Sequence, residues 1–570
     1  MLPSAWLGRR NAFERLGRDR FDVLVVGGGI TGAGIARDAA LRGLRVALVD
    51  RGDFGSGTSS RSSRLIHGGV RYLEHGHLRL VFEASRERRL LLQLAPHLVR
   101  PLAFTWPVYR GARLPRWKLG AGLLLYDLLA GLRSMGRHRR LDAEGVRRAE
   151  PALRPDGLTG GARYWDAATD DARLTLATVL GAAEADALVV NHCAVRALVH
   201  GGGRVTGAVV EDRFGGGART VRADVVVNAT GPWADELLAL DDGRPHAAVR
   251  GTKGAHILVP RDRVGNVSAV TLLSPLDGRV MFVLPAGRFA LVGTTDTRTT
   301  EHPQAVRATE EDVAYLLAAV NALFPAAALG RDDVVSAWAG LRPLVAAGQG
   351  EGAGAEGSAS REHALAWSDT QLLTITGGKL TTYRAMAAEA VEAVLRRLRR
   401  RARPPLTHRR ALPGGELASL DAERSAATAA VGDGETAAWL VGAYGTRWRR
   451  VWGLTERVPA LRERLDPSLP YLAAEVTYAV GFELACTVGD VLLRRTHLAF
   501  ETRDHGRAAA PRVAALMASA LGWDAALTAS MLADYERELT AVFGVVPAAA
   551  PAAVPVDPVD DAGELTESPR

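Results

Sequence analysis

The chain has 570 residues, of which 47% are hydrophobic and 24% charged, a balance typical of a globular protein with two or three domains. Its formal net charge of +8 makes it basic, which alone does not distinguish nucleic acid, an anionic membrane and acidic small molecules as partners. The two widely separated cysteines exclude a disulfide scaffold, we predict no metal site, and no apolar run is long enough for a transmembrane helix.

Near the N-terminus the sequence predicts a strand, a helix and a second strand in succession. FDVLVVGGG (21–29) is a valine-rich apolar run that ends in glycines, as in a buried strand. GAGIARDAALRGL (32–44) has helical periodicity, and RVALVD (45–50) is a second apolar run. This order is the β-α-β arrangement of a Rossmann-like unit.

The first turn of this unit carries three glycines, each with its own role. Gly27 permits a tight turn, Gly29 lets the backbone approach a diphosphate, and Gly32 lets the helix pack closely on the strand. Asp50, at the end of the second strand, is placed to bond the 2′-hydroxyl of a ribose. We therefore predict a dinucleotide site. A glycine-rich turn without a ligand is the less favoured alternative.

Beyond this unit, strands and helices alternate until about residue 405, and the pattern is helical afterwards. We expect short strands between GGG turns over 187–231 and further strands over 250–298. A Gly/Ala/Ser-rich loop should follow over about 346–360, and then a strand, a glycine turn and a long helix over 372–400. Helices are expected from about 405, and a disordered tail over 546–570.

The residues favour FAD among the possible dinucleotides. Asp50 disfavours the 2′-phosphate of NADP. The strand meander that ends in Ala229-Thr230-Gly231 does not look like the second half of an NAD-binding domain. TSSRSSRLIHGG (58–69) offers hydroxyls to a diphosphate and glycine backbone to a flavin ring.

A set of motifs gives the chain a family resemblance. In order they are GGGITGAGIARDAALRG, TSSRSSRLIHGGVRYLEHG, DDARLTL, NATGPWAD, TKGAHILVP, GTTDT, AGLRPL and ITGGKLTTYRAMAAEAV, followed by AAEVTYAVGFELACTVGDVLLRRT. Together they resemble the FAD-dependent (respiratory) glycerol-3-phosphate dehydrogenase family, within the D-amino-acid-oxidase-like superfamily. Asp50 stands for the commoner Glu, and no EF-hand pattern is present, which argues against the calcium-regulated mitochondrial branch.

The resemblance implies a fold class and a domain division. The fold is α/β, with a Rossmann-like FAD-binding domain of the GR2/DAO type, a mixed β-sheet substrate domain and a C-terminal all-helical domain. The oxidoreductase region would span 18–404, with FAD-binding parts over about 18–105, 162–249 and 366–404 and substrate-domain parts over about 106–161 and 250–365, followed by the helical domain over 405–545.

The resemblance also implies the residues of two sites. Besides Gly27, Gly29, Gly32 and Asp50, FAD would contact Ser59, Ser60, Gly68, Gly69, Val195, Ala229, Gly231, Gly378, Lys379, Leu380 and Thr381. The implied substrate is sn-glycerol 3-phosphate, a small dianion suited to bidentate arginines. Its site would contain Arg71, Tyr72, Thr295, Arg342, Arg361 and Lys379.

The implied reaction oxidises a secondary alcohol, with a hydride passing to FAD and a base taking the hydroxyl proton. His67 and His256 are the candidate bases, because imidazole titrates near neutrality. Arg342 or Lys379 would stabilise a developing alkoxide. Structural roles are the alternatives; Arg342, for example, could bond carbonyls at a strand end.

Residues 113–140, RLPRWKLGAGLLLYDLLAGLRSMGRHRR, combine an apolar centre with basic flanks. The centre is too short to span a bilayer. Such a segment suits an anionic membrane surface, and a core-packing helix with basic ends is the alternative. Because the family passes electrons to a membrane quinone, we expect a cytoplasmic protein held peripherally on the inner face of the cell membrane, with a homodimer as one candidate assembly.

Two other functions stay open on the sequence alone. A related FAD-dependent oxidase would pass electrons to oxygen and act on glycerol phosphate, an amine or an amino acid. A nucleic-acid-binding protein is disfavoured, because the sequence has no RNA-binding module and no basic patch interleaved with aromatics. We therefore expect no nucleic acid partner.

Overall fold

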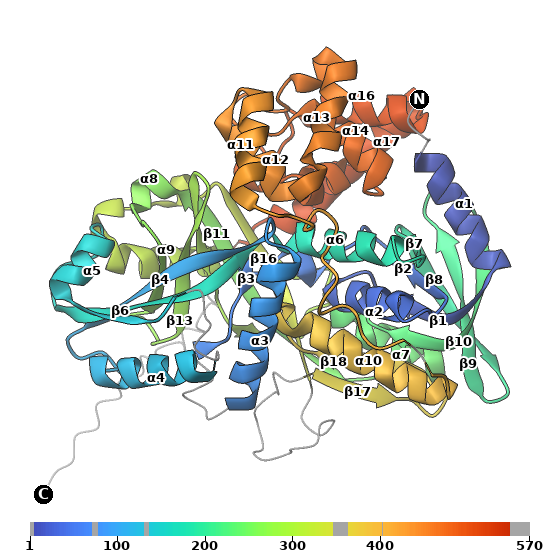
Figure 1. The fold of residues 1–570 in the computed structure, drawn as a ribbon, viewed down its shortest axis with the longest axis horizontal. Coiled ribbons are helices and arrows are strands. Elements are labelled where there is room, and N and C mark those ends of the chain that lie inside the picture. The colour runs from blue at the N-terminus through green and yellow to red at the C-terminus, as the bar shows by residue number, and fades with distance from the viewer. Residues whose placement is uncertain (1–4, 71–77, 130–135, 346–362, 402, 548–570) are drawn as a thin grey trace, which may run out of the picture.

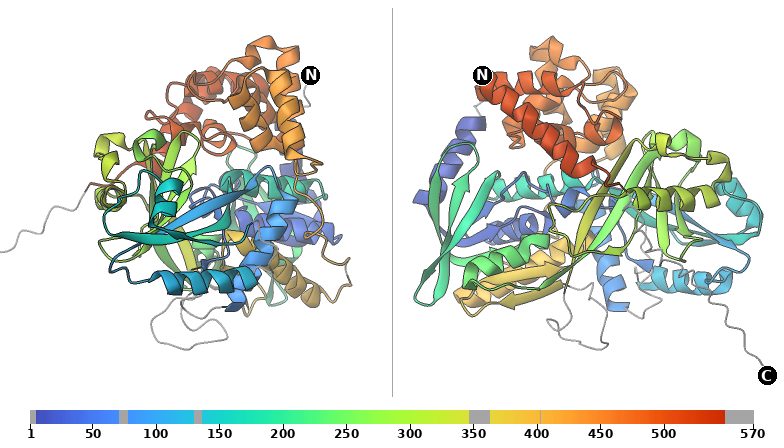
Figure 2. Two further views of the ribbon diagram at one scale, coloured as in Figure 1. Left: turned by 60° about the vertical axis from the view of Figure 1, so that its left-hand side comes forward. Right: turned by 180° about the vertical axis from the view of Figure 1, so that it is seen from behind.

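Two β-sheets lie side by side, and a helical domain packs across them (Figure 1). The computed structural model describes residues 5–70, 78–129, 136–345, 363–401 and 403–547. The eight-stranded sheet is called sheet A and the ten-stranded one sheet B. The helical domain is seen at the top of each view in Figure 2.

Sheet A is a mainly parallel sheet with the strand order β17-β18-β10-β1-β2-β7, extended by the antiparallel strands β9 and β8. Its strands are β1 (Arg20–Val26), β2 (Val46–Val49), β7 (Leu188–Val190), β8 (Cys193–Gly201), β9 (Arg204–Asp212), β10 (Ala218–Asn228), β17 (His363–Trp367) and β18 (Leu373–Gly377). Every residue of β1 after Arg20 is buried, because helices or loops cover both faces. This explains why the strand is a continuous valine-rich run.

Helices from distant parts of the sequence build the layers around sheet A. Helix α2 (Ile30–Leu41) packs between α6 (Asp171–Ala183) and α10 (Tyr383–Leu398). Their alanines and valines share one apolar core with the strands. Helix α1 (Ala5–Arg18) covers β10 and β7 with Phe13 and Leu16.

Sheet B is mixed and has the order β15-β11-β14-β13-β12-β4-β6-β3, with β16 beside β11 and β5 beside β6. Its strands are β3 (Leu65–Ile66), β4 (Val99–Tyr109), β5 (Arg139–Asp142), β6 (Leu158–Thr169), β11 (Val249–Pro260), β12 (Ala269–Leu273), β13 (Val280–Ala286), β14 (Phe289–Gly293), β15 (Thr297–Arg298) and β16 (Ser336–Val345). Strand β4 crosses the expected boundary at residue 105, and it pairs with β6 along its whole length.

The remaining helices flank sheet B or form the C-terminal domain. Beside sheet B lie α3 (Leu78–Leu94), α4 (Arg116–Leu129), α5 (Ala143–Ala149), α8 (Arg261–Val264) and α9 (Glu310–Leu323), and α7 (Ala234–Asp242) follows β10. The C-terminal domain contains α11 (Leu420–Val431), α12 (Gly434–Tyr444), α13 (Trp448–Arg457), α14 (Ala473–Phe482), a π-helical turn (Asp490–Arg495), α15 (Leu498–Glu501), α16 (Ala510–Leu521) and α17 (Ala525–Phe543). One apolar core joins this domain to sheet B through residues such as Trp338.

The described helices include none that is both long and apolar enough to cross a bilayer. The expected tail and the Gly/Ala/Ser-rich loop fall almost entirely outside the described residues.

Candidate active site

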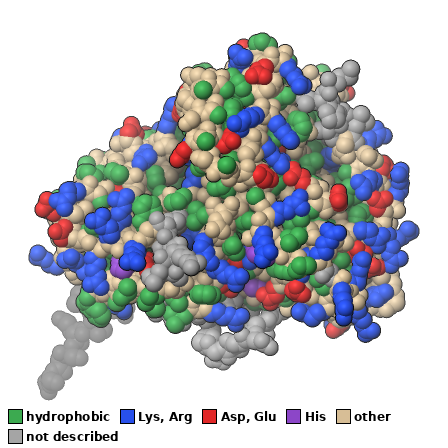
Figure 3. All heavy atoms as spheres, viewed as in Figure 1, with side chains coloured by type: hydrophobic (Ala, Val, Ile, Leu, Met, Phe, Trp, Pro, Cys, Tyr) green, Lys and Arg blue, Asp and Glu red, His purple; other side chains and the backbone are tan. Residues whose placement is uncertain are grey.

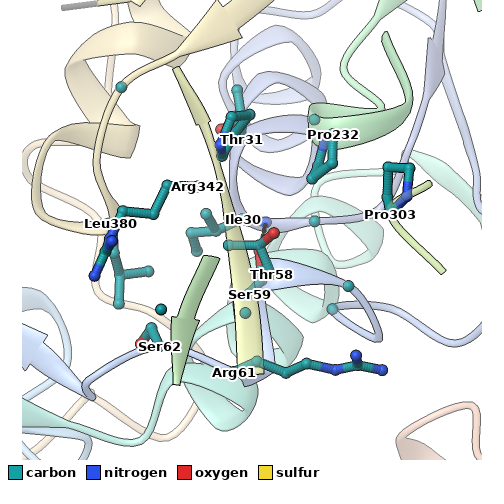
Figure 4. Close-up of a pocket in the computed structure, with 18 of the residues that line it drawn as sticks. Ile30, Thr31, Thr58, Ser59, Arg61, Ser62, Pro232, Pro303, Arg342 and Leu380 are labelled. Carbon is teal, nitrogen blue, oxygen red and sulfur yellow. Dashed lines mark hydrogen bonds between the residues drawn. The ribbon is translucent and has the colours of Figure 1, made fainter. Parts of the chain in front are cut away.

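A cavity of about 1750 Å³ lies between the two sheets and contains most of the expected site residues. Its walls come from the glycine turn after β1, the loop after β2, strand β16 and the segment after β18. Figure 4 shows Arg342 and Leu380 on one side of this cavity and Pro232 and Pro303 on the opposite side. The cavity follows the carboxyl ends of β1 and β2, where parallel sheets bind ligands.

The glycine turn between β1 and α2 packs against protein at Gly27 and Gly32 and faces the cavity at Gly29. A Cβ on Gly27, whose φ is +104°, would lie 2.6 Å from the carbonyl oxygen of Ala229. A Cβ on Gly32 would lie 1.9 Å from the carbonyl oxygen of Gly27, so α2 packs directly on the turn. Gly29 lines the cavity, and a Cβ there would meet only the Ser59 hydroxyl, at 3.2 Å. The backbone is thus exposed where a diphosphate would lie.

Asp50 directly follows β2 and lines the cavity wall. Its oxygens accept hydrogen bonds from the backbone N–H groups of Gly28 at 2.6 Å and Gly52 at 2.8 Å. Burial raises the pKa of Asp50 to about 6, although these two bonds oppose the shift. Val195, Ala229 and Gly231 also line the cavity. The acceptor, the glycine turn and the long cavity fit a dinucleotide such as FAD.

The segment after β18 forms another part of the cavity wall. Gly377 and Gly378 have positive φ angles and turn the chain toward α10. Lys379, Leu380 and Thr381 follow and line the cavity. The Thr381 hydroxyl accepts a hydrogen bond from the backbone N–H of His67 at 3.1 Å, so the two segments are held together.

Three of the expected contact residues lie behind the cavity wall. Ser60 is buried, and it does not line the cavity. The backbone N–H of Gly68 donates to the Tyr126 hydroxyl at 2.9 Å. The Thr295 hydroxyl accepts from the backbone N–H of Ala255 at 2.9 Å and is therefore turned into sheet B. Ser59, Gly69 and Thr294 do line the cavity.

Arg342 enters the cavity from β16. Its guanidinium forms an ion pair with Asp296 at 2.9 Å and donates to the Thr294 hydroxyl at 3.2 Å. The side chain is one-third exposed. These partners orient the fork of the guanidinium and hold a positive charge at the cavity wall.

His256 lies on β11 in the same wall. The ring stacks on Trp338 with centroids 5.6 Å apart, and Nε2 lies 2.9 Å from the Ser63 hydroxyl. Burial, followed by the positive charges of Arg342 and Arg64, lowers the pKa of His256 to about 3. His256 is therefore a neutral imidazole at physiological pH. His67 also lines the cavity.

The structure adds cavity residues that were not among the expected ones. Asp296 and Arg61 both line the cavity. Asp296 lies in the motif GTTDT and Arg61 in TSSRSSRLIHGG, so these motifs could have indicated both positions. An aromatic group made of Phe104, Trp106, Tyr164 and Phe282 also lines the cavity. It comes from three strands whose pairing is not readable from the sequence. Arg71, Tyr72 and Arg361 lie outside the described residues.

This fold and this cavity fit a dinucleotide-binding α/β protein whose cavity wall also carries Arg342 and Lys379. Residues 22–384 match the family described as FAD dependent oxidoreductase, and residues 405–528 match the C-terminal domain of alpha-glycerophosphate oxidase. Glycerol-3-phosphate dehydrogenase 2 of Mycobacterium tuberculosis is 40% identical over 552 residues, which cover 95% of this chain and 92% of that protein. Glycerol-3-phosphate dehydrogenase of Synechocystis is 39% identical, with 90% and 95% covered.

A solved structure supports the same assignment. Glycerol-3-phosphate dehydrogenase from Bacillus halodurans, complexed with FAD, superposes with a TM-score of 0.78 at 31% identity over 95% of this chain and 98% of that one. The chain belongs to the family of FAD-dependent glycerol-3-phosphate dehydrogenases. This confirms the predictions of the family, the fold class and FAD as the cofactor.

Proposed function

We propose that the protein oxidises sn-glycerol 3-phosphate to dihydroxyacetone phosphate and passes the electrons to a membrane quinone. Arg342 carries the substrate part of this proposal. Its guanidinium stands in the cavity wall with Thr294, and Lys379 contributes a second cation to the same cavity. A phosphate dianion accepts charge-assisted hydrogen bonds from such groups. The family relationship points to the same substrate.

When bound, FAD supplies a hydride acceptor, so the protein must position the substrate and remove the hydroxyl proton. Burial and two arginines oppose the protonation of His256 and lower its pKa, which makes it a poor proton acceptor. We therefore assign proton removal to His67 and a hydrogen-bonding role to His256. Lys379 would stabilise negative charge that develops during the reaction.

A membrane surface is proposed at helices α3 and α4. Trp117, Leu124 and Leu128 of α4 expose 71%, 51% and 53% of their surface, and Phe82 of α3 exposes 53%. The cations Arg113, Arg116, Lys118, Arg139 and Arg140 are exposed beside them. In Figure 3 hydrophobic side chains gather at the lower left, where α4 lies, with Lys and Arg side chains near them. Exposed apolar groups flanked by cations suit an anionic membrane.

The cavity approaches this surface, because Arg113, three residues before α4, is also a lining residue. A membrane contact at this surface would lie near the cavity, which supports the proposal of a membrane-dissolved electron acceptor. We propose a cytoplasmic location on the inner face of the cell membrane.

Turnover assays test the acceptor. With sn-glycerol 3-phosphate, the holoenzyme should reduce a short-chain quinone rapidly and form little hydrogen peroxide in air, and glycerol should support neither reaction. Peroxide formed in step with substrate consumption, without quinone reduction, would instead identify an oxidase.

A further inference from the structure

The loop after β2, residues 50–59, fixes the glycine turn at several points. Asp50 accepts a hydrogen bond from the backbone N–H of Gly28 in the turn at 2.6 Å. The backbone N–H of Gly55 donates to the carbonyl oxygen of Gly28 at 3.0 Å, and the Ser59 hydroxyl accepts from the backbone N–H of Ile30 at 3.0 Å. A displacement of this loop would therefore change the shape of the FAD site.

Asp53 lies in the middle of this loop and faces away from the cavity. Its side chain is fully buried. The carboxylate accepts hydrogen bonds from Arg494 Nε at 2.6 Å and from Arg495 Nη1 and Nη2 at 2.5 and 3.0 Å. Asn191 donates a further bond at 3.1 Å. Burial raises the pKa of Asp53, but the two arginines outweigh this effect and keep it below its usual value.

Both arginines belong to the π-helical turn of the C-terminal domain and are themselves fixed. Arg494 also pairs with Asp490 at 2.9 Å and with Glu538 of α17 at 2.6 Å. Arg495 donates to the backbone carbonyl oxygen of Glu483 at 2.7 Å. The arginines thus connect the C-terminal domain to the FAD loop through one buried carboxylate.

The same cluster resembles a metal site, because ligand atoms of Asp53, His192 and Asp490 lie within 4.8 Å of one another. Both carboxylates already receive guanidinium groups. A metal cation would lie beside two arginines and be repelled by them, so we interpret the cluster as an ion-pair contact between domains and not as a metal site.

We propose that the C-terminal domain controls how firmly FAD is held, with Arg494 and Arg495 acting as positioning residues through Asp53. An isolated buried carboxylate is unfavourable, so the loop keeps its position only while the arginines are in place. Because such coupling is reciprocal, bound FAD must also stabilise the contact between Asp53 and the π-helical turn that carries the two arginines. The inference depends on FAD alone and is independent of the proposed substrate and acceptor.

FAD release from the purified holoenzyme tests the proposal. The rate is followed by the rise in flavin fluorescence after dilution. Asp53→Asn removes the shared carboxylate, and Arg495→Lys keeps the charge but loses the bidentate contact. Glu184→Gln is the control, since Glu184, at the C-terminal end of α6, pairs with Arg447 of the C-terminal domain across the same domain boundary, at 2.5 Å.

We expect Asp53→Asn to release FAD at least about tenfold faster than the wild type, and Arg495→Lys to give a smaller increase. Glu184→Gln removes a different contact across this boundary and should change the release rate by less than about twofold. If Asp53→Asn does not fold, Arg495→Lys and Arg494→Lys test the same contact. Equal FAD loss in the control, or wild-type release in the folded loop variants, would overturn the proposal.

Discussion

Arg342 shows how a single residue combines a structural and a chemical role. Its ion pair with Asp296 and its bond to Thr294 hold the guanidinium in place, so little side-chain entropy should be lost when a phosphate binds. The motif AGLRPL suggested this position, but neither the Asp296 partner nor the inward turn of Thr295 could be predicted. Those features depend on how the chain leaves β14, which local patterns do not specify.

Replacing Arg342 should weaken substrate use strongly. We expect Arg342→Ala to lower kcat/KM for sn-glycerol 3-phosphate by at least about a hundredfold, because a charge-assisted contact in a desolvated site contributes roughly 2–5 kcal/mol. Steady-state kinetics measure the effect. Arg298→Ala, at an exposed arginine of β15 that does not line the cavity, should change kcat/KM by less than about twofold. A similar loss in both variants would remove the specific role of Arg342.

At the scale of elements, local sequence patterns predicted individual strands and helices, but they did not predict which distant strands pair. The valine run, the glycine turn and the α2 periodicity identified the β-α-β unit, because each signal lies within a few residues. The extent of β4 was not predictable, since its assignment to sheet B depends on pairing with β6, a strand some fifty residues away. The burial of His256 against Trp338 depends likewise on the pairing of β11 with β16.

Helix α14 contains a buried carboxyl that makes stability depend on pH. Glu475 accepts hydrogen bonds from Trp439 and Tyr444, yet burial outweighs them and raises its pKa to about 7 from 4.5. The folded chain therefore retains a proton that the unfolded chain releases above pH 4.5. This stabilising contribution is complete below that pH and is lost as the pH rises through 7.

The glutamine of Glu475→Gln cannot titrate, so the variant should not share the loss of stability that the wild type shows as the pH rises from 5 to 8. Its free energy of unfolding relative to the wild type should therefore be higher at pH 8 than at pH 5. The expected gain in relative free energy of unfolding is roughly 2–3 kcal/mol, at about 1.36 kcal/mol per pKa unit. Thermal or urea unfolding at both pH values measures it. Glu456→Gln, at an exposed residue of α13, is the control and should show no such trend. If the free energy of unfolding of Glu475→Gln relative to the wild type falls from pH 5 to pH 8, the raised pKa of Glu475 is contradicted.

For the whole molecule, the arrangement in Figure 1 places α4 far from the top of the C-terminal domain. The basic apolar segment was recognisable from its sequence. The sequence did not predict which side chains of that segment are exposed. Leu119 and Leu123 are buried, whereas Trp117 and Leu124 face outward. That difference depends on the rotation of α4 against sheet B.

Charge introduced on this face should prevent membrane binding. We expect the double variant Trp117→Glu/Leu124→Glu to lose cosedimentation with anionic vesicles, because it removes apolar contact and adds repulsion from the lipid headgroups. Val458→Asp is the matched control, since Val458 is 49% exposed on the C-terminal domain. The control should bind as the wild type does, and binding by the double variant would show that another surface is used.

The central claim is that FAD in this cavity is reduced by a phosphorylated alcohol. Anaerobic titration of the holoenzyme with sn-glycerol 3-phosphate, followed by flavin absorbance, tests it most directly. We expect prompt bleaching with this substrate and none with glycerol, which lacks the phosphate that Arg342 would bind. A flavin that stays oxidised with sn-glycerol 3-phosphate, but is bleached by dithionite, would contradict the proposed substrate.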